Sequence, residues 1–219
     1  MMELSKGQEV AALFDLDGVV FDTEPQYSLF WSMKGKTYHP EVERFENVIK
    51  GQTLVQIFDQ WFAGCDDVQR TITGELEDFE RDMAYDYVPG VEDFLRGLRR
   101  AGIRTAVVTS SNDDKMQNVY RAHPEFKSYF DRILTAEFFS RSKPAPDCYL
   151  LGAQVLGLPA TRCVVFEDSF NGLKAGRAAG TKVVGLSTTN VPEQIQDLCD
   201  RVIPDFRDFD VEKLFELLA

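Results

Sequence analysis

From about residue 90 onward, apolar runs that end in polar residues alternate with amphipathic stretches. Within 91–101, apolar residues recur at intervals of three and four, which predicts a helix that ends at Gly102. The same patterns predict strands over 103–108, 132–135, 163–166 and 181–186, and helices over 113–122, from 146, over 169–179 and over 211–218. Strands that alternate with helices of about ten residues predict an α/β fold, a Rossmann-like doubly wound parallel sheet.

Another strand is predicted near the N-terminus. The apolar run 10–14 ends at Asp15-Leu16-Asp17-Gly18, which is typical of a buried strand that breaks at its C-terminal end. Ligands bind at this end of the strands in open parallel sheets. Two acids are costly to bury there unless a positive group, usually a divalent cation, joins them. Taken alone, the stretch is equally compatible with an ordinary Asp-Gly turn.

The segment from 23 to 87 breaks the alternation of strands and helices. Thr23-Glu24-Pro25-Gln26 matches a capping box, and helical patterns follow over 54–62 and 67–84 with little strand signal. We therefore expect a small helical cap, residues 23–87, inserted after the first strand of a core made of residues 1–22 and 88–219. The expected hinges are 21–25 and 85–90.

Composition narrows the class of protein. The formal net charge of −12 argues against non-specific binding to nucleic acid. No run approaches the roughly 18 apolar residues of a membrane span, and Met1–Lys6 lacks the apolar core of a signal peptide. We expect a cytoplasmic protein with no membrane partner, acting as a monomer.

Cysteine and histidine give no sign of a site. The four cysteines are far apart and lack Cys-x-x-Cys spacing, so we expect reduced, mostly buried thiols rather than zinc ligands or disulfides. His39 and His123 have no partner at ligand spacing, and we expect both at the surface.

Four polar clusters fall at the ends of predicted parallel strands, which share one edge of the sheet. They are Asp15 and Asp17; Thr109, Ser110 and Ser111; Lys143; and Glu167 and Asp168. Carboxylates suit Mg²⁺, a helix N-terminus suits phosphate oxygens, and a lysine offsets the negative charge of a phosphoryl group. The sequence therefore predicts a site for a Mg²⁺-bound phosphoryl group at this edge.

These clusters resemble the four motifs of the haloacid dehalogenase superfamily of phosphotransferases. The motifs correspond, in order along the whole chain, to Asp15-Leu16-Asp17-Gly18, Val107-Val108-Thr109, Lys143 and Glu167-Asp168-Ser169-Phe170-Asn171-Gly172. The helical insert resembles the family's cap. The most similar branch is that of beta-phosphoglucomutase and the sugar-phosphate phosphatases.

The resemblance implies roles for single residues. Asp15 would be the nucleophile that forms an aspartyl-phosphate, and Asp17 the general acid and then base. Mg²⁺ would be held by Asp15, the backbone carbonyl of Asp17, Glu167 and Asp168. The phosphate would be bound by a further set, namely Thr109, Ser110, Ser111 and Lys143.

The cap bears on the substrate. Gly51 resembles the glycine of the family's substrate loop, but Leu54 replaces the mutase arginine that binds the distal phosphate, and Tyr27 replaces a mutase histidine. Lys50 or Arg81 could supply the missing charge. These departures favour a phosphatase acting on a small phosphorylated metabolite, and a sugar phosphate is the favoured candidate. The alternative is a beta-phosphoglucomutase that interconverts beta-glucose 1-phosphate and glucose 6-phosphate.

Other classes fit less well. A non-catalytic binding protein on this fold would be expected to lose the nucleophile or the metal-binding acids, and a haloacid dehalogenase proper would lose the second acid, Asp17; all are present. No G-x-G-x-x-G follows the first strand, which disfavours a dinucleotide-binding enzyme, and no G-x-x-x-x-G-K-[ST] marks a P-loop kinase.

Overall fold

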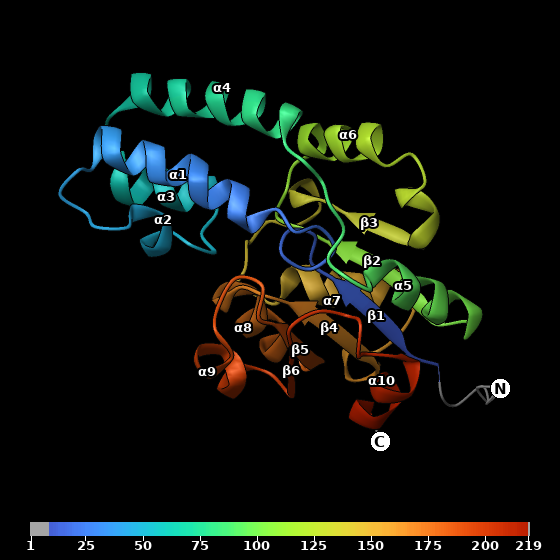
Figure 1. Cartoon of the computed structure of the whole chain (residues 1–219). Coiled ribbons are helices and arrows are strands. Elements are labelled where there is room, and N and C mark those ends of the chain that lie inside the picture. The colour runs from blue at the N-terminus through green and yellow to red at the C-terminus, as the bar shows by residue number, and fades with distance from the viewer. Residues whose placement is uncertain (1–8, 219) are drawn as a thin grey trace.

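A computed structural model describes residues 9–218 and contains a six-stranded sheet in the order β3-β2-β1-β4-β5-β6 (Figure 1). All neighbouring strands pair in parallel. The strands are β1 (Ala11–Phe14), β2 (Arg104–Val108), β3 (Arg132–Leu134), β4 (Cys163–Glu167), β5 (Lys182–Leu186) and β6 (Arg201–Ile203). The predicted α/β class with a doubly wound parallel sheet is confirmed. The segment Met1–Lys6, on which the expectation of no signal peptide rests, lies outside the described residues.

Helices cover both faces of the sheet because its central strands are apolar on both sides. The flanking helices are α5 (Val91–Arg100), α6 (Asp113–Ala122), α7 (Asp147–Val155), α8 (Phe170–Ala179), α9 (Pro192–Ile195) and α10 (Val211–Leu218). Short 3₁₀ turns occupy Phe126–Tyr129, Ala136–Phe138, Ala160–Arg162 and Gln196–Leu198. Phe14 belongs to the cluster under α5, α6 and α10, whereas Leu13 belongs to the cluster under α7 and α8.

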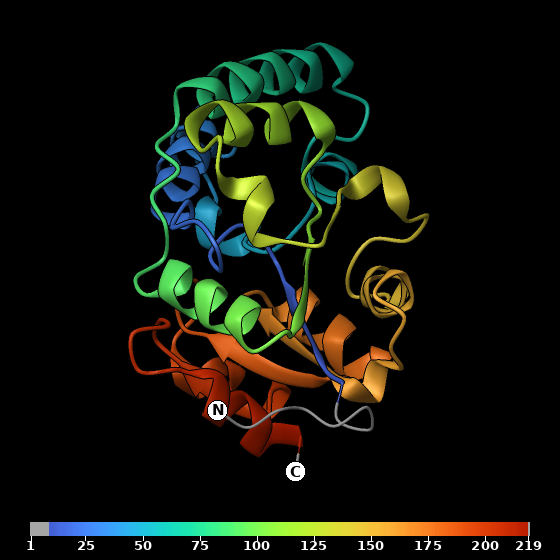
Figure 2. The same ribbon diagram turned by 90° about the vertical axis from the view of Figure 1, so that its right-hand side faces the viewer.

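Four further helices form a layer beyond one end of the sheet (Figures 1 and 2). They are α1 (Glu24–Tyr38), α2 (Phe45–Val48), α3 (Leu54–Trp61) and α4 (Asp66–Asp82). This helical layer has its own apolar core, which includes Phe30, Phe45, Ile57 and Ile72. Its buried residues are distinct from those of the two clusters that flank the sheet.

Two chain segments connect the helical layer to the sheet, and they run side by side. Phe21 and Tyr87 form an antiparallel bridge, and the amide of Asp22 donates to the carbonyl of Asp86 at 2.8 Å. His123 packs its ring against Phe21 and Tyr87. The expectation of a surface position for this histidine is therefore wrong, because the aromatic pair at the connection half-buries it.

Other local expectations had mixed outcomes. All four cysteines are free thiols, and three are buried, as expected. His39 is half-buried against the ring of Phe45, not exposed. Thr23 makes no capping bond to α1, so the capping-box prediction is wrong there; a capping box forms instead between Thr53 and Gln56 at α3. None of the helices within residues 9–218 has both the length and the apolar character needed to cross a membrane.

Candidate active site

The predicted site residues converge at the C-terminal edge of the sheet. All but Gly51 come from the end of β4, from the loops after β1, β2 and β4 or from the segment before α7; Gly51 lies in the loop between α2 and α3. They surround a cavity of about 310 Å³ between the sheet and the helical layer. Eight of the nine predicted residues line it, namely Asp15, Asp17, Gly51, Thr109, Ser110, Ser111, Lys143 and Asp168. Glu167 lies beneath the wall.

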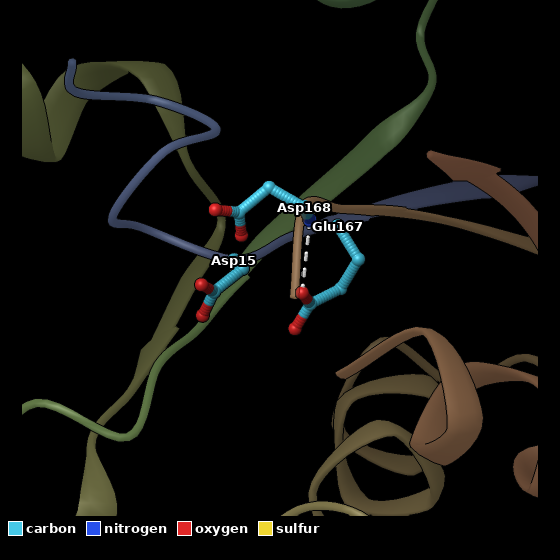
Figure 3. A group of neighbouring side chains, drawn as sticks. All are labelled: Asp15, Glu167 and Asp168. Carbon is cyan, nitrogen blue, oxygen red and sulfur yellow. Dashed lines mark hydrogen bonds between the residues drawn. The ribbon is translucent and has the colours of Figure 1, made fainter. Parts of the chain in front are cut away.

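Three carboxylates form a group that could hold a cation. Asp15, Glu167 and Asp168 each place one oxygen within 4.8 Å of the others. In Figure 3 the carboxylates of Asp15 and Asp168 point to the same side, whereas the side chain of Glu167 folds back so that its carboxylate accepts from the amide of Asp168. Burial, with repulsion from Glu167, raises the pKa of Asp168 well above its ordinary range. Three carboxylates beside a single ammonium, two of them buried and that of Asp15 partly buried, are a donor set that fits a divalent cation.

Lys143 provides the ammonium of this group. Its Nζ lies 2.8 Å from Oδ1 of Asp15 and 2.6 Å from Oε1 of Glu167, and the residue is buried. Burial alone would lower the pKa of Lys143, but the two carboxylates outweigh it and raise this pKa, so the group stays charged. Burial raises the pKa of Asp15 to about 7, against the opposing attraction of Lys143. Proton and metal cation therefore compete for Asp15 near neutral pH.

Glu167 is fully buried and accepts five hydrogen bonds from the protein. Oε1 accepts from Lys143 at 2.6 Å and from the hydroxyl of Tyr149 at 2.8 Å. Oε2 accepts from the amides of Asp168 (3.0 Å) and Ser169 (3.1 Å) and from the Ser169 hydroxyl (3.1 Å). A direct bond to a metal would require Glu167 to give up one of these partners. The contacts suit a residue that positions Lys143.

Position 18 in the first motif must be a glycine because the side chain of Asp168 occupies the space beside it. Gly18 adopts a left-handed φ of +69°, and a Cβ there would overlap the Asp168 carboxylate. That carboxylate also accepts a hydrogen bond from the hydroxyl of Thr189, and its backbone carbonyl accepts from Asn190 at 2.9 Å. The β5–α9 loop thus orients Asp168, a role that no sequence pattern indicated.

Asp17 is held by three donors from different parts of the chain. Oδ1 accepts from the Thr23 hydroxyl at 2.6 Å; Oδ2 accepts from the Ser111 hydroxyl at 3.1 Å and from Nζ of Lys115 at 2.5 Å. Burial opposes ionisation of Asp17, but the charge and hydrogen bond of Lys115 outweigh it and lower this pKa. Thr23 is fully buried beside this carboxylate, which explains why it does not cap α1.

Lys115 is a site residue that the sequence reading missed. It is 4% exposed and stands next to the buried Met116 in α6. A lysine on the apolar stripe of a helix was the available signal, since such a charge is rarely buried without a partner.

The N-terminus of α6 faces the cavity. Asn112 caps the helix by accepting from the amide of Lys115 at 2.9 Å. Thr109 is buried, and its hydroxyl accepts from the Ser111 amide at 3.0 Å. A helix N-terminus beside hydroxyl groups is a favourable site for phosphate oxygens.

The helical layer completes the cavity. Tyr27 and Leu54, at the positions where the mutase has histidine and arginine, both line it, and so does Lys50. Arg81 does not; it pairs with Asp78 at 2.8 Å on the surface, so it cannot supply the missing charge. Two contacts join the loop around Gly51 to the sheet domain, Lys50 to the carbonyl of Thr189 at 2.8 Å and Asn171 to the carbonyl of Gly51 at 2.9 Å.

Comparisons with known proteins agree with this geometry. A model of the haloacid dehalogenase-like hydrolases matches residues 10–180. Hexitol phosphatase A of Escherichia coli is 34% identical over 182 residues, which cover 80% of this chain and 82% of the relative. Fructose-1-phosphate phosphatase YqaB of E. coli is 31% identical over 179 residues, which cover 78% of this chain and 93% of the relative.

Solved structures share the fold. A haloacid dehalogenase-type hydrolase from Entamoeba histolytica superposes with a TM-score of 0.83 at 24% identity, over 95% of this chain and 99% of the other. A beta-phosphoglucomutase from Clostridium difficile superposes with a TM-score of 0.74 at 21% identity, over 96% and 97%. The chain belongs to the family of haloacid dehalogenase-like hydrolases.

Proposed function

We propose that this protein is a Mg²⁺-dependent phosphatase that hydrolyses a small sugar phosphate through an aspartyl-phosphate on Asp15. The observation that carries the proposal is the arrangement of Asp15 and Lys143, 2.8 Å apart at the floor of a cavity that Asp17 also lines. Its relatives named for hexitol phosphate and fructose 1-phosphate hydrolysis support the sugar-phosphate class.

The proposed reaction has two steps. An oxygen of Asp15 attacks phosphorus while the bond to the leaving-group oxygen breaks, and Asp17 donates a proton to that oxygen, for which Asp17 must enter the step protonated against its lowered pKa. Asp17 then takes a proton from a water molecule that attacks the aspartyl-phosphate, which releases phosphate and restores Asp15. Lys143 and the N-terminus of α6 bind the phosphoryl oxygens throughout, with the hydroxyls of Thr109, Ser110 and Ser111 beside them.

Mg²⁺ fits the carboxylates described above. Asp15, Asp168 and the backbone carbonyl of Asp17 would hold the ion, with Glu167 positioning Lys143 from beneath. Bound there, Mg²⁺ would neutralise charge on the phosphoryl group and reduce its repulsion by Asp15.

We propose that residues 23–87 act as a cap over this site. The helical layer supplies the wall opposite Asp15, so its closure would exclude water and select the leaving group. A cavity of about 310 Å³ accommodates a small metabolite and no macromolecule. Free thiols at all four cysteines support a cytoplasmic location.

The test is Mg²⁺-dependent phosphate release from a panel of sugar phosphates. We expect turnover by the wild-type protein, loss of turnover with EDTA, and none by Asp15→Asn. Full activity of Asp15→Asn would refute the mechanism. Beta-glucose 1-phosphate with a trace of the 1,6-bisphosphate separates the alternative, because a mutase would form glucose 6-phosphate and a phosphatase would release free phosphate.

A further inference from the structure

The wall that the helical layer contributes to the cavity is strongly acidic. Four glutamates line it, and Lys50 is the only cation among the described residues of the layer that line the cavity; Arg44, which does not line it, pairs with Glu46 at 3.6 Å. The glutamates are Glu24, Glu46, Glu77 and Glu80. With the residues of the sheet edge included, seven carboxylates and three ammonium groups line the cavity, and none of the described lining residues is an arginine or a histidine.

Each ammonium group already has a partner in the protein. Lys143 binds Asp15, and Lys115 binds Asp17 while lying 4.7 Å from the ring centre of Tyr27. Lys50 donates to the carbonyl of Thr189. An extra anionic group on a substrate would therefore meet carboxylates on the layer side, with at most Lys50 to offset them.

The same wall is well suited to hydroxyl groups. The Tyr27 hydroxyl donates to Oε1 of Glu80 at 2.7 Å, so the tyrosine oxygen and the second carboxylate oxygen remain able to accept hydrogen bonds. Glu24 also lines the cavity and adds further acceptor oxygens. The Trp31 ring and aliphatic side chains supply an apolar surface for the C–H face of a carbon chain.

We infer that the cavity selects phosphate monoesters whose leaving group is an uncharged polyol, and that it rejects substrates with a second phosphate or a carboxylate. This inference rests on the proposed function and specifies its substrate class. Like charges brought together in a partly enclosed cavity repel more strongly than in bulk water. Unmatched charge of this kind is a common means of excluding competing ligands.

The experiment compares three six-carbon substrates with the full-length protein and Mg²⁺. They are sorbitol 6-phosphate, 6-phosphogluconate and fructose 1,6-bisphosphate, the first without a second anionic group and the others with one. We expect kcat/KM for sorbitol 6-phosphate to exceed both others by about tenfold or more. Equal or better turnover of either anionic substrate would overturn the inference. Absence of phosphate release from all three and from p-nitrophenyl phosphate would refute the proposed function itself.

Variants of the wall test the cause. Glu77→Gln/Glu80→Gln removes two charges with little change of shape, so the preference for sorbitol 6-phosphate should narrow several-fold. Glu75→Gln is the matched control, because it removes the same kind of charge from α4 but does not line the cavity. If the ratio of kcat/KM values were unchanged in the double variant, or fell equally in Glu75→Gln, the glutamates of the wall would not be the cause of the preference. Thermal melting of each variant checks that it is folded.

Discussion

Nζ of Lys115 lies 2.5 Å from Oδ2 of Asp17, although the two residues are 98 positions apart in the chain. The same ammonium lies 4.7 Å from the ring centre of Tyr27 in the helical layer. Lys115 therefore links the carboxylate proposed as acid and base to both α6 and the first helix of the layer. It fixes Asp17 in the direction of the cavity together with Thr23 and Ser111.

Replacing Lys115 should slow hydrolysis most for substrates whose leaving group must be protonated as it departs. In Lys115→Met, Asp17 loses one of three donors and its orientation becomes less defined. Because general acid catalysis contributes about 10²–10⁴-fold, we expect hydrolysis of an alkyl phosphate to fall about tenfold or more. Hydrolysis of p-nitrophenyl phosphate should fall much less, since its leaving group departs without a proton. Steady-state phosphate release with both substrates measures the difference.

The exposed Lys174 on α8 offers a control of equal charge. Lys174→Met should leave both rates unchanged. Equal losses on the two substrates in Lys115→Met would show that Lys115 acts on stability or binding and not through Asp17.

Gly172 is predicted to be intolerant of a side chain. It lies in the first turn of α8, and a Cβ there would overlap the carboxylate of Glu167. Since Glu167 holds Lys143, Gly172→Ala should displace both. Overpacking of this kind costs about 1–3 kcal/mol of unfolding free energy. We expect a lower melting temperature and a large loss of phosphate release.

Gly74 provides the matched substitution. It lies within α4, and nothing stands within 4 Å of a Cβ at this position. Gly74→Ala should stabilise the protein by about 0.5–1 kcal/mol, because alanine favours the helix. If Gly172→Ala melted as high as Gly74→Ala and stayed active, the packing of Glu167 against α8 would not matter for the site.

Most of the sheet could be predicted because its strands are apolar runs that end in polar residues. The sixth strand, Arg201–Ile203, was not predicted; it has three residues, of which only Ile203 is buried. The capping box at Thr23 failed for a structural reason. The Thr-x-x-Gln spacing was right. The Thr23 hydroxyl, however, donates its hydrogen bond to the carboxylate of Asp17 and not to the helix.

The site was predictable where residues follow strand ends and unpredictable where contacts cross between elements. Asp15, Lys143 and Asp168 were found through their motifs. Tyr149 contacts Glu167, and Thr189 contacts Asp168, through the packing of helices and loops that no local pattern encodes. These residues orient the motif side chains, so their identity depends on the folded geometry.

Mg²⁺ should stabilise the protein more at neutral than at mildly acidic pH. Burial raises the pKa of Asp15 from 3.8 to about 7 and also raises that of Asp168. Between 3.8 and about 7 the folded protein holds protons that the unfolded chain has lost, so without metal its unfolding free energy falls as the pH rises. Mg²⁺ binds the deprotonated carboxylates, and it therefore offsets this loss above the raised pKa.

Melting curves with Mg²⁺ and with EDTA at about pH 5.5 and about pH 7.5 measure this effect. The increase in melting temperature caused by Mg²⁺ should be larger at the higher pH. Asp168→Asn should reduce the increase at both. If Mg²⁺ raised the melting temperature of the wild-type protein equally at the two pH values, the ion would not bind through these carboxylates.

The two contacts between the Gly51 loop and the sheet domain should favour the closed position of the helical layer. Lys50 donates to the carbonyl of Thr189, and Asn171 donates to the carbonyl of Gly51. Lys50→Met/Asn171→Ala removes both hydrogen bonds, each worth about 0.5–1.5 kcal/mol, and leaves Asp15 and Lys143 untouched. Because substrate must then supply more of the closing free energy, KM should rise several-fold with kcat little changed. Lys36→Met, an exposed lysine of α1, serves as the control. A loss in kcat at constant KM would mean that these contacts serve the chemical step and not closure.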